Sequence, residues 1–157
     1  MPERFELRAR EAVARCLIRR LVVPRVYFAP HWPNETGAAV DVLVIDRNGA
    51  GDVHVIEIKR TAKDAIATIP SLLKIDAPYR WIAFRAGTED RKTALSLLSE
   101  AALYPKDSAG KIGVIEVVES MGGLGANVKI TAERFPGRYY DLATRFAETH
   151  DADIEYR

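Results

Sequence analysis

The sequence predicts a single α/β domain in which a mixed central sheet is covered by helices on both faces. Residues 41–46 and 53–58 are β-branched and apolar at both parities, which is typical of strands that are buried on both sides. A short connection rich in turn formers, 47–51, joins them. The chain has 157 residues, 48% of them hydrophobic, and this is enough for one proper core. No internal repeat or linker divides it.

The N-terminal elements follow from apolar periodicity and from the position of a proline. Residues 3–21 carry apolar side chains at helical spacing, so we expect the first helix there. The apolar run over 22–29 predicts a strand, and Pro24 within it favours an edge position or a late start. The loop 30–37 leads to the next strand. It is either an ordinary polar connection or a segment that contacts a substrate through residues such as Trp32.

The middle of the chain alternates helix and strand signals. After the second central strand, Thr61 can cap a helix, with Asp64 three residues on, as in a weak capping box. Pro70 is expected to end or kink that helix, because proline cannot donate a backbone hydrogen bond. We expect a short buried strand over 79–85 and a further helix over 88–104.

The C-terminal part predicts an added hairpin and a last helix. Strands are expected over 111–119 and 127–133, on either side of a glycine-rich flexible turn at 121–125, and the helix over 138–150. The glycine cluster lacks the lysine and the following helix of a phosphate-binding loop. The single domain, 1–157, therefore comprises a core of about residues 1–110 and an extension of about residues 111–157, which extends the sheet or makes a subunit contact.

Charged residues in the two central strands come together if these strands form a hairpin. If Asp46 faces Asp52, then Asp41 falls directly opposite Glu57, and opposed side chains share a face with Cβ atoms about 4.5–5.5 Å apart. Lys59 lies two residues beyond Glu57 and therefore projects on the same side. A register error of two residues would preserve the shared face, whereas an error of one would destroy it.

Two carboxylates this close repel each other unless a cation lies between them or one of them takes a proton. Oxygen ligands with room for water suit Mg²⁺ or Mn²⁺. Lys59 can then hold an attacking water or an anionic oxygen, which is the logic of metal-assisted hydrolysis. The alternative is a buried structural ion pair of Lys59 with Asp41 or Glu57, although such a pair leaves the second carboxylate unexplained.

The pattern of Asp41 followed by Glu57-x-Lys59, on a hairpin behind a helix, resembles the PD-(D/E)xK nuclease superfamily, which includes restriction endonucleases, archaeal Holliday-junction resolvases and many repair nucleases. The resemblance covers about the first half of the chain, through the strand at 79–85. It implies a restriction-endonuclease-like core of helix, three strands, helix and strand, with Mg²⁺-dependent phosphodiester cleavage. It also implies that Asp41, Glu57 and Ile58 bind Mg²⁺ or Mn²⁺ and that Lys59 positions the nucleophile.

Many members of that superfamily add an acidic residue from the first helix, and two glutamates compete for this role. Glu6 projects between Val13 and Leu17 in the apolar stripe, so its carboxylate needs a partner in the interior. Glu11 lies at the opposite edge, where an ordinary surface pair with Arg15 explains it. We expect Glu6 to be the third acidic group at the site, with Glu11 as the fallback. A glutamate that reaches solvent from a frayed helix start is the alternative for Glu6.

The first helix also carries a row of arginines on the side away from the core. Arg8, Arg15 and Arg19 fall within a narrow sector of the helix. Guanidinium groups recognise phosphate through paired hydrogen bonds, so this row can follow a nucleic-acid backbone. A solvated helix face is the ordinary alternative.

Composition limits the choice of function and compartment. The 23 basic and 22 acidic residues give no general basic field, so any nucleic-acid binding must come from a local patch. A single cysteine excludes an internal disulfide framework and a cysteine zinc site. His54 has the opposite strand parity to Glu57 and is expected to face away from the site. No signal peptide or membrane-spanning run is evident, and we expect a soluble, cytoplasmic protein.

The sequence therefore favours a Mg²⁺- or Mn²⁺-dependent nuclease that acts on DNA, does not bind membranes and can form a homodimer. Two other functions stay open. The chain can be a non-catalytic module of the same fold that binds nucleic acid or a protein. It can also be an assembly protein in which the charged trio is merely a structural ion pair.

Overall fold

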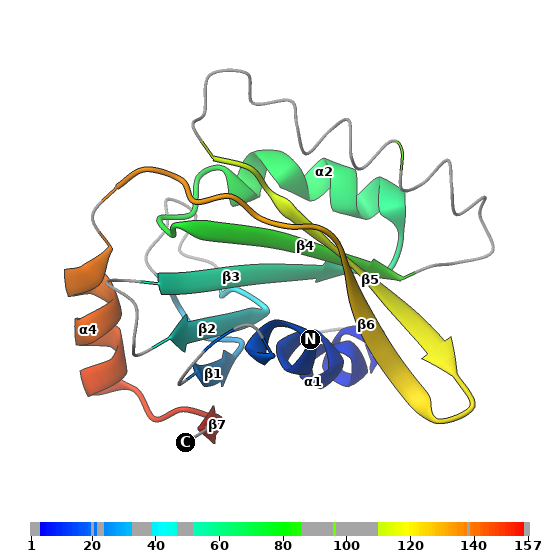
Figure 1. Cartoon of the computed structure of the whole chain (residues 1–157), viewed down its shortest axis with the longest axis horizontal. Helices are drawn as coiled ribbons and strands as arrows, with labels where there is room; N and C mark the ends of the chain where they lie inside the picture. The colour runs from blue at the N-terminus through cyan, green and yellow to red at the C-terminus, as the bar shows by residue number, and fades with distance from the viewer. Residues whose placement is uncertain are drawn as a thin grey trace.

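The computed structural model describes residues 4–19, 21, 24–32, 39–46, 52–85, 96, 110–137 and 139–155. In chain order the elements are α1 (Arg4–Ile18), β1 (Pro24–Phe28), β2 (Val42–Asp46), β3 (Asp52–Lys59), α2 (Ala62–Leu72), β4 (Tyr79–Arg85), β5 (Gly113–Ser120), β6 (Gly123–Ile130), α4 (Tyr140–Thr149) and β7 (Ile154–Glu155) (Figure 1). The expected turn at 47–51 lies outside the described residues. So does the expected helix at 88–104, except for Ser96, which is helical.

The strands form one mixed sheet in the order β6-β5-β4-β3-β2-β1-β7. From β1 to β3 the chain runs as an antiparallel meander. The next two pairs, β3 with β4 and β4 with β5, are parallel, and β5 and β6 close the sheet as an antiparallel hairpin. The helix α2 connects the parallel strands β3 and β4, as such a crossover requires. The predicted C-terminal hairpin therefore extends the sheet.

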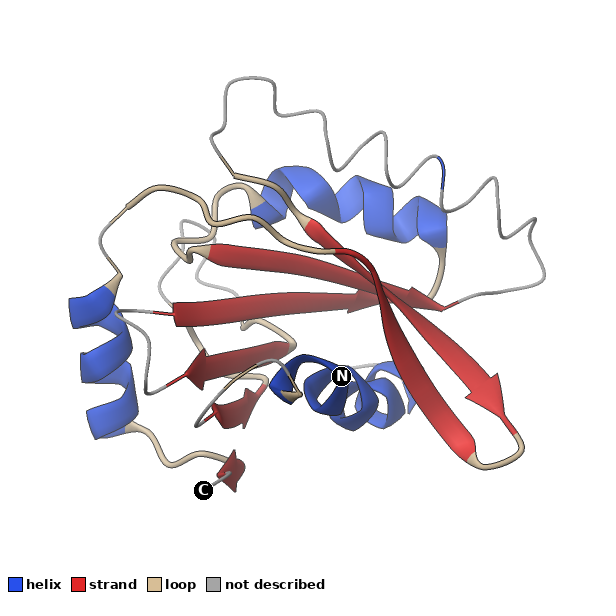
Figure 2. Cartoon of the chain, viewed as in Figure 1, coloured by secondary structure: helices blue, strands red, loops and turns tan. Residues whose placement is uncertain are grey.

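Helices cover both faces of the sheet, as the strand composition predicts (Figure 2). The helix α1 packs on one face through Ala9, Val13 and Leu17. On the other face, α2 and α4 pack on side chains of the same central strands at the opposite parity. Because both faces are covered, β2 and β3 carry buried apolar residues at both parities. No helix within the described part of the chain is long and apolar enough to cross a membrane.

The helix α2 begins as expected but continues past its proline. The Thr61 hydroxyl accepts a hydrogen bond from the Asp64 amide at 3.1 Å, which satisfies one of the free amides of the first turn. Pro70 lies inside the helix, which runs on to Leu72. The helix thus does not end at Pro70, because a proline near the last turn removes only one helical hydrogen bond, and the alternative expectation of a kink at Pro70 stays a prediction.

The turn of the β5–β6 hairpin is shorter than the sequence predicts. Only Met121 and Gly122 lie between the two strands, and Gly123 to Gly125 belong to β6. Gly123 has a φ of 114°, which favours glycine, so the cluster does supply the turn geometry. The flexible turn predicted over residues 121–125 is therefore too long, because pairing with β5 and packing on α1 recruit a glycine-rich segment into the sheet.

Gly113 provides a test of the packing between the parallel strands. A Cβ atom at this position would overlap the Trp81 indole on the neighbouring strand. We expect Gly113→Ala to lower the free energy of unfolding by about 1–3 kcal/mol, because overpacking a filled core forces side chains off their rotamers. Denaturant titration followed by tryptophan fluorescence measures this. Gly125→Ala, where a Cβ would meet nothing within 4 Å, is the control and should cost far less.

Candidate active site

The β2–β3 hairpin has the register that the sequence predicts. Asp46 pairs with Asp52, and the ladder continues to Val42 opposite Ile56. Asp41 is the next residue and therefore stands opposite Glu57. Its Oδ2 accepts a hydrogen bond from the Ile58 amide at 2.7 Å, so the main chain of Ile58 faces the Asp41 carboxylate.

The backbone around Asp41 is held by the neighbouring strand. The Ala29 amide donates to the Asp41 carbonyl at 3.0 Å, and the Val40 amide donates to the Pro30 carbonyl at the same distance. Ala29 has a φ of 50°, which is strained for a residue with a Cβ. Trp32, which the sequence allowed as a substrate contact, is instead buried and donates its indole N–H to the Asp76 carbonyl at 2.7 Å.

Lys59 projects on the same side of the sheet as Glu57. In the parallel ladder, Glu57 pairs with Ile82 and Lys59 pairs with Phe84. Both partners belong to the core beneath α2. Because aligned residues on adjacent strands point to the same side, Glu57 and Lys59 lie on the α2 face. Asp41, Glu57 and Lys59 are all half-buried, so the structure brings this trio together at a site that solvent reaches.

The surroundings of Glu57 strongly disfavour its ionised form. Burial, the charge of Asp41 and a hydrogen bond between the two carboxyl groups raise the pKa of Glu57 to about 9. The charge of Lys59 lowers the pKa of Glu57 but is outweighed by these effects. At neutral pH Glu57 therefore holds a proton next to Asp41, which is one of the two ways in which neighbouring carboxyl groups avoid repulsion.

Of the two helix glutamates, Glu6 is the one near the site. It lies in the first turn of α1, half-buried, and its charge contributes to the raised pKa of Glu57. The body of α1 packs on the other face of the sheet, so it is the start of the helix that approaches the site. Glu11 is exposed. The structure thus places Glu6, rather than the fallback, within electrostatic range of the trio.

The chemistry of these residues suits a hard divalent cation. Asp41 and Glu57 offer oxygen atoms, and the shared proton occupies the place where a cation would offset their repulsion. Ile58 contacts Asp41 through its amide, whereas a main-chain ligand to a cation would be its carbonyl oxygen. Among the described residues, no group of three or more His, Cys, Asp or Glu side chains is arranged to hold a metal ion. Water would have to complete the coordination, as it usually does for Mg²⁺.

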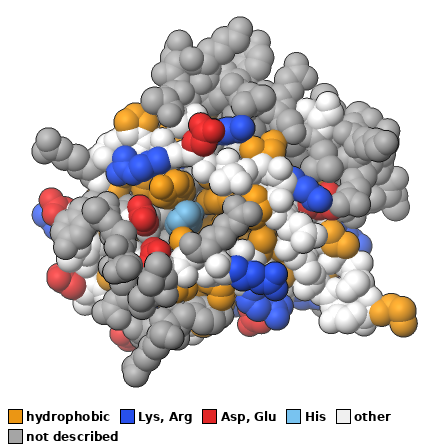
Figure 3. All heavy atoms as spheres, in the orientation of Figure 1, with side chains coloured by type: hydrophobic (Ala, Val, Ile, Leu, Met, Phe, Trp, Pro, Cys, Tyr) orange, Lys and Arg blue, Asp and Glu red, His pale blue; other side chains and the backbone are white. Residues whose placement is uncertain are grey.

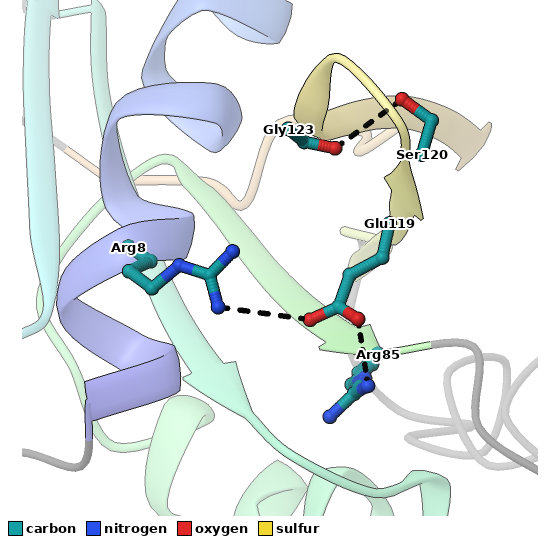
Figure 4. A network of polar contacts seen from close by, with 5 residues as sticks. All are labelled: Arg8, Arg85, Glu119, Ser120 and Gly123. Atoms are coloured by element: carbon teal, nitrogen blue, oxygen red, sulfur yellow. Dashed lines mark hydrogen bonds and ion pairs between the residues drawn. The ribbon is translucent and has the colours of Figure 1, made fainter.

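The arginines of α1 do not all lie free on the helix surface. Arg15 and Arg19 are exposed. Arg8 is also exposed, but its Nη1 lies 3.9 Å from Oε1 of Glu119 on β5. The other oxygen of Glu119 accepts a hydrogen bond from Nη2 of Arg85 at 2.9 Å (Figure 4). On the face shown in Figure 3, basic side chains form separate groups with acidic side chains near several of them, in keeping with the balanced net charge.

Two further charged residues lie at this end of the sheet, Glu116 on the α2 side and Arg85 on the α1 face, and neither is among the residues that the sequence predicts for the site. Arg85 ends β4, and its neighbour Phe84 pairs with Lys59, so Arg85 lies at the same end of the sheet as the trio. The rule that ligands gather at the carboxyl ends of parallel strands could have identified it. Glu116 on β5 is fully buried. It pairs with Phe84 of β4, which pairs with Lys59 of β3 across its other edge. The sequence could have indicated Glu116, because it is an acidic residue within an apolar run, the same pattern that singles out Glu57.

His54 faces away from the trio, as its parity predicts. It accepts a hydrogen bond at Nδ1 from the Trp81 indole at 3.0 Å and stacks on Tyr79 with a centroid separation of 4.5 Å. Burial lowers the pKa of His54 to about 4, against the opposing charge of Asp46. His54 is therefore neutral at pH 7 and acts as a core residue.

Comparisons with known proteins support the fold. No family model and no curated protein matches the chain. A solved structure does match, the SPO1766 protein of unknown function from Silicibacter pomeroyi, which is 16% identical. The match has a TM-score of 0.54 and covers 98% of this chain and 100% of that chain. At this level of identity the likeness shows a shared fold and carries no information about activity.

Proposed function

We propose that the chain is a nuclease of the PD-(D/E)xK superfamily that hydrolyses phosphodiester bonds in DNA with Mg²⁺ or Mn²⁺. The observation that carries the proposal is the pairing of Asp41 with Glu57, where two carboxyl groups share a half-buried site and the pKa of Glu57 is about 9. A structural ion pair needs one carboxylate for one lysine. The second carboxylate is better explained by a cation that replaces the proton.

The order of the elements supports the same proposal. Helix, three strands, helix and strand follow one another from α1 to β4, as in the restriction-endonuclease-like core. The three strands form a meander, and β4 returns parallel to β3 after α2. Asp41, directly before β2, and the Glu-x-Lys at the end of β3 would then fill the catalytic positions of this core.

Each residue then has a defined role. Asp41, Glu57 and the Ile58 main chain would hold the cation, and Glu6 would add negative charge from the helix. When bound, the cation lowers the pKa of a water ligand and offsets charge on the phosphate. Lys59 would orient the attacking water or bind a non-bridging phosphate oxygen. Arg8, Arg15 and Arg19 would follow the sugar-phosphate backbone away from the cleavage point.

A cleavage assay tests the proposal directly. Plasmid, branched and single-stranded DNA are incubated with the protein and Mg²⁺ or Mn²⁺, beside Asp41→Asn. We expect cleavage by the wild type, loss of cleavage on adding EDTA, and none by the variant. Asp151→Asn removes an exposed aspartate and is the matched control. Equal cleavage by wild type and Asp41→Asn would overturn the proposal, and binding of DNA without cleavage would favour the non-catalytic module.

The two helix glutamates give a second prediction. Glu6→Gln should reduce cleavage by about 10- to 100-fold, because it removes charge that helps to hold the cation. Glu11→Gln should leave the rate unchanged, since Glu11 is exposed and does not contribute to the pKa of Glu57. Initial rates measured over a Mg²⁺ titration separate the two variants. Similar rates for both would assign Glu6 a purely structural role.

The arginine row of α1 gives a third prediction. Replacing Arg15 and Arg19 together by alanine should weaken DNA binding about equally for all sequences and reduce the slope of log affinity against log salt by about 2. Fluorescence anisotropy across a range of salt concentrations measures both. The pair Lys63→Ala/Lys74→Ala removes the same charge from two exposed positions, one in α2 and one just after it, and is the control. Indistinguishable slopes for the two double variants would show that the α1 arginines are only a solvated helix face.

A further inference from the structure

Three side chains from three elements converge on the α1 face of the sheet, at the same end as the candidate active site. Arg8 comes from α1, Arg85 from the end of β4 and Glu119 from β5 (Figure 4). Both arginines point at the one carboxylate of Glu119, Arg85 at 2.9 Å and Arg8 at 3.9 Å. Two guanidinium groups therefore share a single counter-charge, and the cluster carries a net positive charge.

The cluster has a fixed place relative to the site. Arg85 directly follows Phe84, whose partner in the parallel ladder is Lys59. The Arg85 guanidinium also lies 5.7 Å from the centroid of the Phe5 ring. Phe5 is buried and directly precedes Glu6, which acts on Glu57. The arginines thus lie at the same end of the sheet as the trio and close to the start of α1, but on the α1 face, whereas the trio lies on the α2 face.

The three side chains are open to exchange with a ligand. Their exposed fractions are 52% for Arg8, 32% for Arg85 and 41% for Glu119. Ion pairs as exposed as these contribute little to stability, so a competing anion can replace the carboxylate at small cost. Guanidinium groups bind carboxylate and phosphate with the same paired geometry, and phosphate offers more acceptor oxygens.

We propose that Arg8 and Arg85 form a second phosphate subsite, which Glu119 occupies in the free protein and vacates when the DNA backbone binds. The ligand is another phosphodiester of the same DNA, away from the one that is cleaved, so the inference rests on the proposed function for the identity of the substrate. Glu119 acts as an internal competitor of that phosphate. It keeps the two arginines apart from other anions and lowers the affinity for DNA.

This arrangement predicts substitution effects of opposite sign. Glu119→Gln removes the competitor and should tighten DNA binding about three- to tenfold. Arg85→Ala should weaken binding by a similar factor, and Arg8→Ala should weaken it less, because Arg8 lies farther from Glu119. In the Arg85→Ala background, Glu119→Gln should have at most half of its effect on log affinity, since only one arginine is left to release.

Fluorescence anisotropy with a short labelled DNA duplex, in EDTA, measures these affinities without cleavage. Arg145→Ala and Glu148→Gln, both exposed on α4, are the charge-matched controls and should bind like the wild type. Thermal unfolding of each variant confirms that it is folded. If the cluster were only a structural network, Glu119→Gln and Arg85→Ala would shift affinity no more than the controls do, and this result would overturn the subsite.

The experiment separates the subsite from the nuclease proposal. Opposite effects of Glu119→Gln and Arg85→Ala in a protein that never cleaves DNA would support the subsite and count against the nuclease. Cleavage by the wild type, with unchanged binding by all three cluster variants, would support the nuclease and overturn the subsite. Failure of the wild type to bind the duplex at any salt concentration would overturn the subsite as well.

Discussion

Replacing Lys59 by alanine is expected to reduce DNA cleavage by about a hundred- to a thousand-fold, which is the usual cost of removing one charge that stabilises the transition state. The ammonium group shares a face with Asp41 and Glu57, and in the proposed mechanism it is not a ligand of the cation. Mn²⁺ affinity, measured by calorimetry, should therefore stay within about tenfold of the wild type. A large fall in the rate with a small change in Mn²⁺ affinity would identify Lys59 as a group that acts on the reacting atoms.

Two variants control this prediction. Lys63→Ala removes an exposed lysine four residues away on α2 and should cleave at the wild-type rate. Lys59→Arg retains the charge with a different shape and should recover part of the activity. If Lys59→Ala cleaved as fast as Lys63→Ala, the lysine would be only a counter-charge for Glu57.

Replacing Glu57 by glutamine is expected to stabilise the metal-free protein at neutral and alkaline pH. The pKa of Glu57 is about 9 in the folded chain, against 4.5 for the ordinary side chain. Below about pH 4.5 both states hold the proton, and between these two values only the folded state holds it. The contribution of Glu57 to stability therefore falls as pH rises through this window. At about pH 8 the variant should be more stable by roughly 2–4 kcal/mol.

Denaturant titrations in EDTA, at about pH 4 and about pH 8, measure this difference. The difference between wild type and Glu57→Gln should be small at the lower pH and large at the higher one. Because His54 is present in both proteins, its own titration cancels. Adding Mn²⁺ should stabilise the wild type at about pH 8 and have little effect on the variant. A variant less stable than the wild type at both pH values would show that Glu57 makes a favourable structural ion pair.

The hairpin could be predicted from the sequence because its physical signals are local. The short connection at 47–51 suggests the register, strand alternation gives the face, and the cost of charges in apolar strands marks the site. The apolar run from Trp81 to Phe84 likewise defined β4, whose predicted bounds agree with the structure. The superfamily resemblance implies an acid from the first helix, helical periodicity favours Glu6 over Glu11, and the structure places Glu6 within electrostatic range of Glu57.

Other features depend on contacts between distant segments and could not be predicted in this way. The strand β6 contains two glycines and an asparagine, which are poor strand formers, and it becomes a strand because β5 and α1 offer it partners. The approach of Arg8, Arg85 and Glu119 joins three elements that no sequence spacing relates. The raised pKa of Glu57 depends on burial, which only the folded chain provides.

The most direct test of the cation site is the number of protons released when Mn²⁺ binds. Calorimetric titrations near pH 7, in buffers with different ionisation enthalpies, give this number. Because Glu57 holds a proton at this pH, binding to both carboxylates should release about one proton for each Mn²⁺. The release should disappear in Glu57→Gln, and Asp41→Asn should bind Mn²⁺ much more weakly. Undetectable Mn²⁺ binding by the wild type, or equal binding by Asp41→Asn, would contradict the proposed site.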